Sequence, residues 1–176
     1  MGAELSDQER ERYAEQIERI GLDAQLRLKS VRAIVIGARA AGSAAAAHLA
    51  SSGVGYVGVV DGGQVSLGDL PGQAVLYTPD VGSNRAEAVA AKLGVLNTAV
   101  HAESYPVDVD EANAPAIVMG HDVAVDCGSK SPLAEACRAT GVALVPAPGP
   151  RAADGLRAAE EALAVLTSGT REGAPA

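Results

Sequence analysis

Short apolar runs alternate along the chain with longer segments of helical spacing. The first run covers residues 33–36; an Ala-rich segment follows over 40–52, and a second apolar run covers 56–60. A buried strand, a helix and another buried strand within about 30 residues are typical of a βαβ unit. The crossover in such a unit is right-handed.

The same alternation continues towards the C-terminus. It predicts a Rossmann-like α/β fold, with a mostly parallel open sheet and helices on both faces. The loop over residues 62–80 is too long for a simple turn, which makes it a candidate functional loop. Residues 105–116 form a Pro- and Asp-rich stretch after an apolar alternation around Val100. Further helices are predicted over 84–96, 132–140 and 152–167, and further strands over 122–126 and 142–145.

The N-terminal segment is predicted to be helical and separate from the sheet. Ser6 and Glu9 have the spacing of a capping box, and apolar residues follow at helical spacing, so we expect a helix over 7–20 and a short amphipathic turn over 23–29. We therefore divide the chain into three parts: an N-terminal helical dimerisation segment over 1–30, a Rossmann-like domain over 31–167 and a flexible tail over 168–176.

Charge and composition narrow the expected partners. The 22 acidic residues outnumber the 14 basic ones, giving a net charge of −8, which repels nucleic acid and anionic membrane surfaces. With no Trp, no Phe and four Tyr, the chain also lacks an aromatic platform for stacking bases. The acidic N-terminus is unlike a signal peptide and no run of about 18 apolar residues occurs, so we expect a cytoplasmic protein.

The cysteines do not indicate a metal site. Cys127 and Cys137 are ten positions apart, a spacing that matches neither a CxxC pair nor known zinc-ligand patterns. We interpret both as small core residues and expect no bound metal.

A glycine-containing loop follows the first predicted strand. Gly37 and Gly42 begin and end this loop, and Asp61 ends the second strand, where a ribose-binding acid is found in dinucleotide-binding folds. Arg39 occupies the position at which a glycine would let the backbone approach phosphate. Two interpretations stay open: the glycines serve only the turn and the packing, or they contact a nucleotide. Arg39 is either a solvated loop residue or a substitute cation, and Asp61 either a ribose ligand or a strand-end cap.

Residues 6–100 and the segment DVAVDCGSK resemble the ThiF/MoeB family, the bacterial relatives of the ubiquitin-activating enzymes. The closing helix, AADGLRAAEEALAVLTSG, is similar to the terminal helix of that family. The resemblance implies a dimeric adenylyltransferase fold. Such proteins use ATP and magnesium to adenylate the C-terminal glycine of a ubiquitin-like sulfur carrier.

Several charged positions of the family hold other residues here. The resemblance places the arginine that is donated across the dimer at Glu15, the arginine of the NLxRQ motif at Gly72 and the metal-associated aspartate at Ser129. Residues 146–151 directly join two elements between which the family inserts the segment that holds the carrier. We therefore expect no catalytic residues and no metal, and at most weakly bound ATP. The expected nucleotide-binding set is Gly37, Arg39, Gly42, Asp61, Gln73 and Arg85, the last in place of a lysine.

Two functional readings follow. The first is a non-catalytic ThiF/MoeB-type domain that forms a homodimer, or a heterodimer with an intact relative, with a ubiquitin-like carrier as a further candidate partner. The second is a working enzyme: either an adenylyltransferase that uses Arg39 and Arg85 as substitute cations, or a dinucleotide-binding enzyme that uses Asp61.

Overall fold

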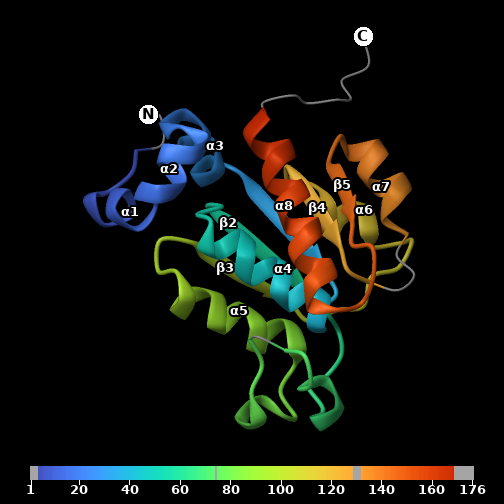
Figure 1. Cartoon of the computed structure of the whole chain (residues 1–176). Coiled ribbons are helices and arrows are strands. Elements are labelled where there is room, and N and C mark those ends of the chain that lie inside the picture. Colours follow the sequence, from blue (N-terminus) through green and yellow to red (C-terminus); the bar gives the residue numbers. More distant parts are fainter. Residues whose placement is uncertain (1–3, 74, 129–131, 169–176) are drawn as a thin grey trace.

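The computed structural model describes residues 4–73, 75–128 and 132–168, and in these ranges it contains a parallel sheet of five strands (Figure 1). The strand order is β3-β2-β1-β4-β5, so the chain reverses its direction of travel across the sheet between β1 and β4. Ligands of open α/β sheets bind at the carboxyl ends of the strands, at such a reversal. The strands are β1 (Arg32–Ile36), β2 (Tyr56–Val60), β3 (His101–Tyr105), β4 (Val123–Asp126) and β5 (Ala143–Pro146).

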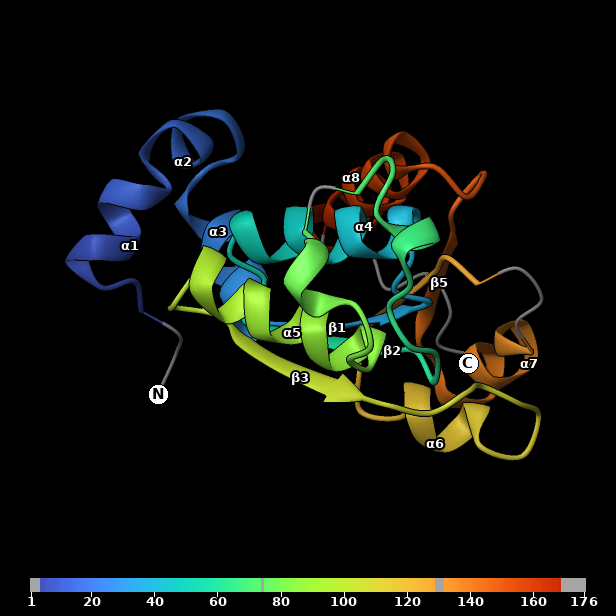
Figure 2. The ribbon, with the colours of Figure 1, turned by 90° about the horizontal axis from the view of Figure 1, so that it is seen from below.

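Helices cover both faces of the sheet, as the predicted Rossmann-like fold requires (Figure 2). Alternate strand residues point to opposite faces, so the sheet contributes to two separate apolar clusters. Helices α4 (Ala40–Ser51), α5 (Arg85–Leu96) and α8 (Ala152–Ser168) pack on one face, and α6 (Ala114–Val118) and α7 (Leu133–Thr140) pack on the other.

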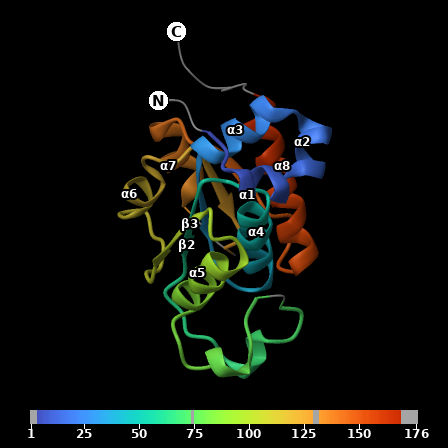
Figure 3. The same ribbon diagram turned by 90° about the vertical axis from the view of Figure 1, so that its left-hand side faces the viewer.

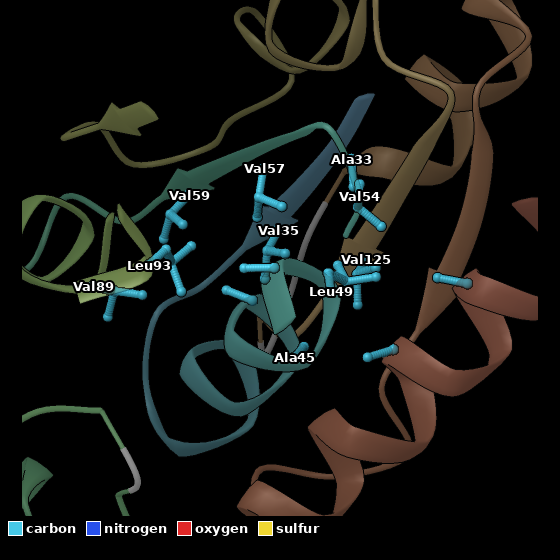
Figure 4. Close-up of a cluster of buried hydrophobic side chains, with 14 of the residues drawn as sticks. Ala33, Val35, Ala45, Leu49, Val54, Val57, Val59, Val89, Leu93 and Val125 are labelled. Carbon is cyan, nitrogen blue, oxygen red and sulfur yellow. The ribbon is translucent and has the colours of Figure 1, made fainter. Parts of the chain in front are cut away.

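Small side chains bring the helices close to the sheet and to each other. In the larger cluster, Val35 and Val57 of the strands face Leu49 of α4 and Leu93 of α5 (Figure 4). The contact between α4 and α8 is closer still, since a Cβ added at Gly155 would lie 1.8 Å from the backbone carbonyl oxygen of Ala41. This contact therefore requires glycine.

The N-terminal segment forms three helices where one helix and a short amphipathic turn were predicted: α1 (Asp7–Arg12), α2 (Ala14–Ile20) and α3 (Leu22–Ser30). The capping box is confirmed, because Ser6 Oγ accepts from the backbone of Glu9 and the Glu9 carboxylate accepts from the backbone of Ser6. The expected helix over 7–20 is broken at Tyr13, with φ −100° and ψ 13°. The break coincides with burial of the Tyr13 ring, whose hydroxyl accepts a 2.7 Å hydrogen bond from Asn97 Nδ2.

Two elements differ from the sequence pattern. Strand β3 lies at the edge of the sheet and alternates between half-buried and exposed residues, so it lacks the apolar run of the inner strands. Helix α6 is a short helix inside the Pro- and Asp-rich stretch and has Pro115 in its first turn. Helix α8 also includes Ser168, which corrects the predicted start of the tail; residues 169–176 lie outside the described ranges.

Within the described ranges, none of the helices combines the length and the apolar character that crossing a bilayer requires.

Replacing Gly155 tests the close contact between α4 and α8. Because the new Cβ would collide with backbone, Gly155→Ala should lower the free energy of unfolding by about 3 kcal/mol, as overpacking does. Gly94→Ala is the matched control, since a Cβ there meets no atom within 4 Å and alanine is the better helix former. Urea unfolding followed by circular dichroism measures both variants. Equal stability of Gly155→Ala and the wild type would contradict the close packing.

Candidate functional site

A cavity of about 710 Å³, hereafter the pocket, opens at the carboxyl ends of the inner strands. Its walls come from the loop after β1, the end of β2, the loop after β4 and residues 147–150. Residues 107–109, after β3, form a further part of the wall. The last part belongs to residues 62–84, hereafter the arm, which connect β2 to α5 and project away from the sheet (Figures 1 and 3). Four of the predicted nucleotide-binding residues line the pocket: Gly37, Arg39, Asp61 and Gln73.

The two loop glycines have clear local roles. Gly37 has φ +86°, and a Cβ there would lie 3.1 Å from the carbonyl oxygen of Cys127. A Cβ at Gly42 would lie 1.6 Å from the carbonyl oxygen of Gly37, so Gly42 permits the helix to start close to the strand. Gly42 does not line the pocket. The turn and the packing therefore account for both glycines, and nucleotide contact through them stays a prediction.

The carboxylate of Asp61 already has a full set of hydrogen-bond donors. It accepts 2.8 Å bonds from the backbone N–H groups of Ala38 and Gly63, and Nη1 of Arg85 lies 2.8 and 2.9 Å from its two oxygens. A carboxylate offers about four lone-pair sites. A ribose hydroxyl at Asp61 would therefore have to displace one of these donors.

Arg85 lies behind the pocket rather than on its wall. Its side chain is 7% exposed; beside the pair with Asp61, Nη2 donates a 2.9 Å hydrogen bond to the carbonyl of Gln64 and lies 3.7 Å from Asp69. The sequence suggested a cation facing a phosphate. In the structure, both ends of the guanidinium bind groups of the protein itself.

Arg39 is the one basic side chain that the described part of the chain brings to the pocket wall, and it is also paired. Its Nη1 lies 2.9 Å from Oδ1 of Asp69, whose side chain is 3% exposed whereas that of Arg39 is 71% exposed. Burial acts to raise the pKa of Asp69, but hydrogen bonds from Ser66 and the charges of Arg85 and Arg39 outweigh it and hold that pKa below its usual value. The lowered pKa makes Asp69 an ionised carboxylate at neutral pH.

The charge balance of the pocket disfavours polyanions. Among the described residues that line it, one side chain is basic, Arg39, and three are acidic, Asp61, Asp69 and Asp108. Negative groups at such short range repel phosphates, and the low-dielectric surroundings strengthen the repulsion. Among the described residues, no group of three His, Cys, Asp or Glu side chains is arranged to hold a metal ion. These residues do not fit a magnesium-bound triphosphate.

The other predicted positions lie elsewhere. Glu15 is exposed on α2, at the end of the domain opposite the arm (Figures 1 and 3). Gly72 has φ +76°, in a turn closed by a 3.1 Å bond from the N–H of Gln73 to the carbonyl of Leu70, so an arginine there would be strained. Ser129 lies outside the described residues.

Gln73 lines the pocket and contacts the first turns of α4. Its Oε1 accepts a 2.6 Å hydrogen bond from the hydroxyl of Ser43, while its buried Nε2 has no hydrogen-bond partner among the described residues. With the pair of Arg39 and Asp69, this contact connects the arm to the start of α4 at a second point.

Two of the lining residues that the sequence did not predict as part of the site follow a strand and have side chains that can ionise, Asp108 and Cys127. Asp108 follows β3, and since that strand was not predicted, no sequence signal placed Asp108 at the pocket. Cys127 follows β4, and burial together with nearby Asp126 raises its pKa to about 12, so it remains a neutral thiol and a poor nucleophile. Cys137 is buried as predicted, and the same causes raise its pKa to about 11.

Removing Arg85 tests how strongly the paired carboxylates depend on it. Arg85→Leu leaves Asp61 and Asp69 buried without their shared cation, and should lower the free energy of unfolding by about 3–5 kcal/mol. Arg39→Leu removes the more exposed partner of Asp69 and should cost about 1 kcal/mol or less. Urea unfolding measures both. Similar losses for the two variants would contradict the central role of Arg85.

The lowered pKa of Asp69 predicts a pH dependence of stability. The contribution of ionised Asp69 to the free energy of unfolding is complete above its unfolded-state pKa of about 3.9. This contribution is lost as the pH falls through the lower folded-state pKa. The unfolding free energy of Asp69→Asn should therefore decrease less than that of the wild type between about pH 5 and pH 2. Unfolding curves across this range provide the comparison, and parallel decreases for the two proteins would be inconsistent with an ionised Asp69 in the folded state.

Two known proteins are similar to this chain in amino-acid sequence. The SAMP-activating enzyme E1 of Haloferax volcanii is 38% identical over 141 residues, covering 77% of this chain and 52% of that protein. The sulfur carrier protein adenylyltransferase of Thermus thermophilus is 35% identical over 127 residues. The match covers 71% of this chain and 47% of that relative. The chain thus spans about half the length of these two relatives.

A solved structure supports the same assignment at the level of the fold. Escherichia coli tRNA N6-threonylcarbamoyladenosine dehydratase, TcdA, in complex with AMP, matches with a TM-score of 0.77 and 24% identity, covering 81% of this chain and 60% of that one. A sequence profile of the ThiF family matches residues 13–147, from the buried tyrosine between α1 and α2 to the residue after β5. The chain therefore belongs to the ThiF family.

Proposed function

We propose that this chain is a ThiF-family domain that does not catalyse adenylation and acts as the non-catalytic partner of another protein. The observation that carries the proposal is the pairing of both basic side chains of the site with carboxylates of the protein: Arg85 with Asp61, and Arg39 with Asp69. A cation paired in this way must leave its carboxylate before it can neutralise a phosphate group.

Adenylation makes strong demands on fixed positive charge. A carboxylate attacks the α-phosphate, pyrophosphate leaves, and the negative charge must be stabilised by cations that are held in place before reaction. Removing one such group costs about 3 kcal/mol of transition-state stabilisation. The effects of removing several groups that act together are not additive. Glu15 and Gly72 stand where the resemblance implies arginines, and the two remaining arginines are paired. Together, the two replacements and the two ion pairs support the loss of the adenylation reaction.

The N-terminal segment supports a role in pairing with another protein. Polar side chains fix this segment to the ends of two helices: Asn97 Nδ2 donates to the Tyr13 hydroxyl, and Gln16 Nε2 donates a 2.8 Å bond to the carbonyl of Ser52. Most of the remaining surface of α2 is exposed. A segment that is held rigidly and left exposed is suited to a homodimer, or to a heterodimer with an intact ThiF/MoeB-like protein.

A ubiquitin-like carrier is a further candidate partner of such a complex. One relative is named for adenylating a sulfur carrier protein. In this chain, β5 continues directly through residues 147–151 into α8. The resemblance implies that the segment holding the carrier is inserted at this place in the family. In a heterodimer, the intact partner would supply that segment together with the catalytic cations.

Calorimetric titration with ATP and magnesium tests the proposal. We expect a Kd weaker than about 1 mM and no pyrophosphate exchange in the presence of a carrier that ends in Gly-Gly, since each 1.4 kcal/mol of lost attraction weakens binding tenfold. The Thermus thermophilus relative is the positive control. Asp69→Asn removes one negative charge from the wall and frees Arg39, so this variant should bind tripolyphosphate more tightly than the wild type.

Two results would overturn the proposal. Micromolar ATP binding with carrier-dependent pyrophosphate exchange would identify a working adenylyltransferase, and micromolar binding of NAD would identify a dinucleotide-binding enzyme instead. Unchanged tripolyphosphate affinity in Asp69→Asn would remove the electrostatic explanation.

A further inference from the structure

Strand β3 has a free edge with accessible backbone. Within the described ranges it is the outermost strand, paired with β2 alone. The N–H of His101 donates to Gly55, and the carbonyl of Tyr105 accepts from Asp61, so the backbone groups of these residues point towards β2. In a parallel ladder the direction alternates. The N–H and C=O groups of Ala102 and Ser104 therefore point outward, and both side chains are small.

A shallow groove of about 500 Å³ runs between this edge and α5. Ala90, Ala91 and Gly94 of α5 line it opposite Ala102 and Ser104. Gly94 is unusual because glycine weakens a helix, yet a Cβ at this position would meet no atom within 4 Å. Packing within the domain therefore does not require glycine here. The empty space lies where a chain added to β3 would place its side chains.

Two carboxylates, those of Glu103 and Glu87, lie along this edge, and Arg32 is close enough for its charge to act on Glu103. Glu103 points to the sheet face away from the groove, is 50% exposed, and accepts a 2.6 Å hydrogen bond from the Tyr56 hydroxyl. Its one ion-pair contact among the described residues is His101 at 4.0 Å, which is a cation only when protonated. Glu87 lies in the groove wall, and none of the described residues that line the groove is a lysine or an arginine. A bound segment with positive charge would complement this edge.

We propose that the free edge of β3 binds an extended segment of a partner protein as an additional strand. Ala102 and Ser104 would supply the main-chain hydrogen bonds, the groove beside Gly94 would take apolar side chains, and a lysine or arginine would lie opposite Glu103. Alternate residues of an added strand point to opposite faces, so one segment can satisfy both requirements.

A second copy of this chain is a poorer occupant. Antiparallel pairing of two identical β3 strands about their central residue would place Glu103 directly opposite Glu103. Like charges in that position are destabilising. The edge therefore favours a segment of a different protein, with alternating apolar and basic residues. Binding of that segment is independent of the pocket.

Fluorescence polarisation with a labelled heptapeptide of alternating valine and lysine tests this proposal. We expect saturable binding in the micromolar range, and binding at least about tenfold weaker for the peptide with glutamate in place of lysine. Gly94→Leu fills the groove and improves helix propensity, so it should abolish binding without lowering the Tm. Val95→Leu is the matched control, because Val95 is 81% exposed and does not line the groove. Glu103→Gln should weaken lysine-peptide binding severalfold.

Three results would contradict binding of a partner segment at this edge. Absence of saturable binding up to about 1 mM peptide would overturn the proposal, as would full binding by a folded Gly94→Leu variant. Self-association of the wild type that Gly94→Leu abolishes would also overturn it, because the occupant would then be a second copy of this chain.

Discussion

The ion pair between Arg85 and Asp61 is the interaction on which the site depends. Asp61 directly follows β2, Arg85 begins α5, and the arm between them is closed at its base by this pair. The same carboxylate accepts from the N–H of Ala38, so it also fixes the loop after β1. A buried charge is tolerated only when it is paired and hydrogen-bonded, and each partner here would be costly to leave alone. The pair therefore sets the shape of the pocket and its charge.

This constraint gives a physical basis for the proposed loss of adenylation in a chain that keeps the family fold. The parallel sheet, the glycine turn and the acidic residue after β2 are all present, so the architecture of a nucleotide site is kept. The positive charge has been redistributed: Arg85 neutralises Asp61, and Arg39 neutralises Asp69 across the mouth of the pocket. The arm is attached to the start of α4 both by this second pair and by the contact of Gln73 with Ser43. Under the proposed function, this chain keeps the fold without the reaction, since a fold does not by itself determine an activity.

The sequence predicted the inner strands, their helices and the glycine turn because these depend on local pattern. Apolar runs identify buried strands, and Gly37 and Gly42 are needed by backbone geometry close to them in the chain. Only four of the six predicted binding residues line the pocket. No local sequence pattern predicts a side-chain pair between positions as far apart as 61 and 85, and this pair holds Arg85 behind the pocket. Edge strand β3 lacks an apolar run, and Asp108 after it was missed for that reason.

A crystal of the protein soaked with ATP and magnesium provides the most direct measurement of the charge in the pocket. The account predicts no ordered phosphates beside Arg39, with Arg85 still bound to both oxygens of Asp61. Well-ordered phosphates held by Arg39, with Arg85 turned away from Asp61 to reach them, would contradict it.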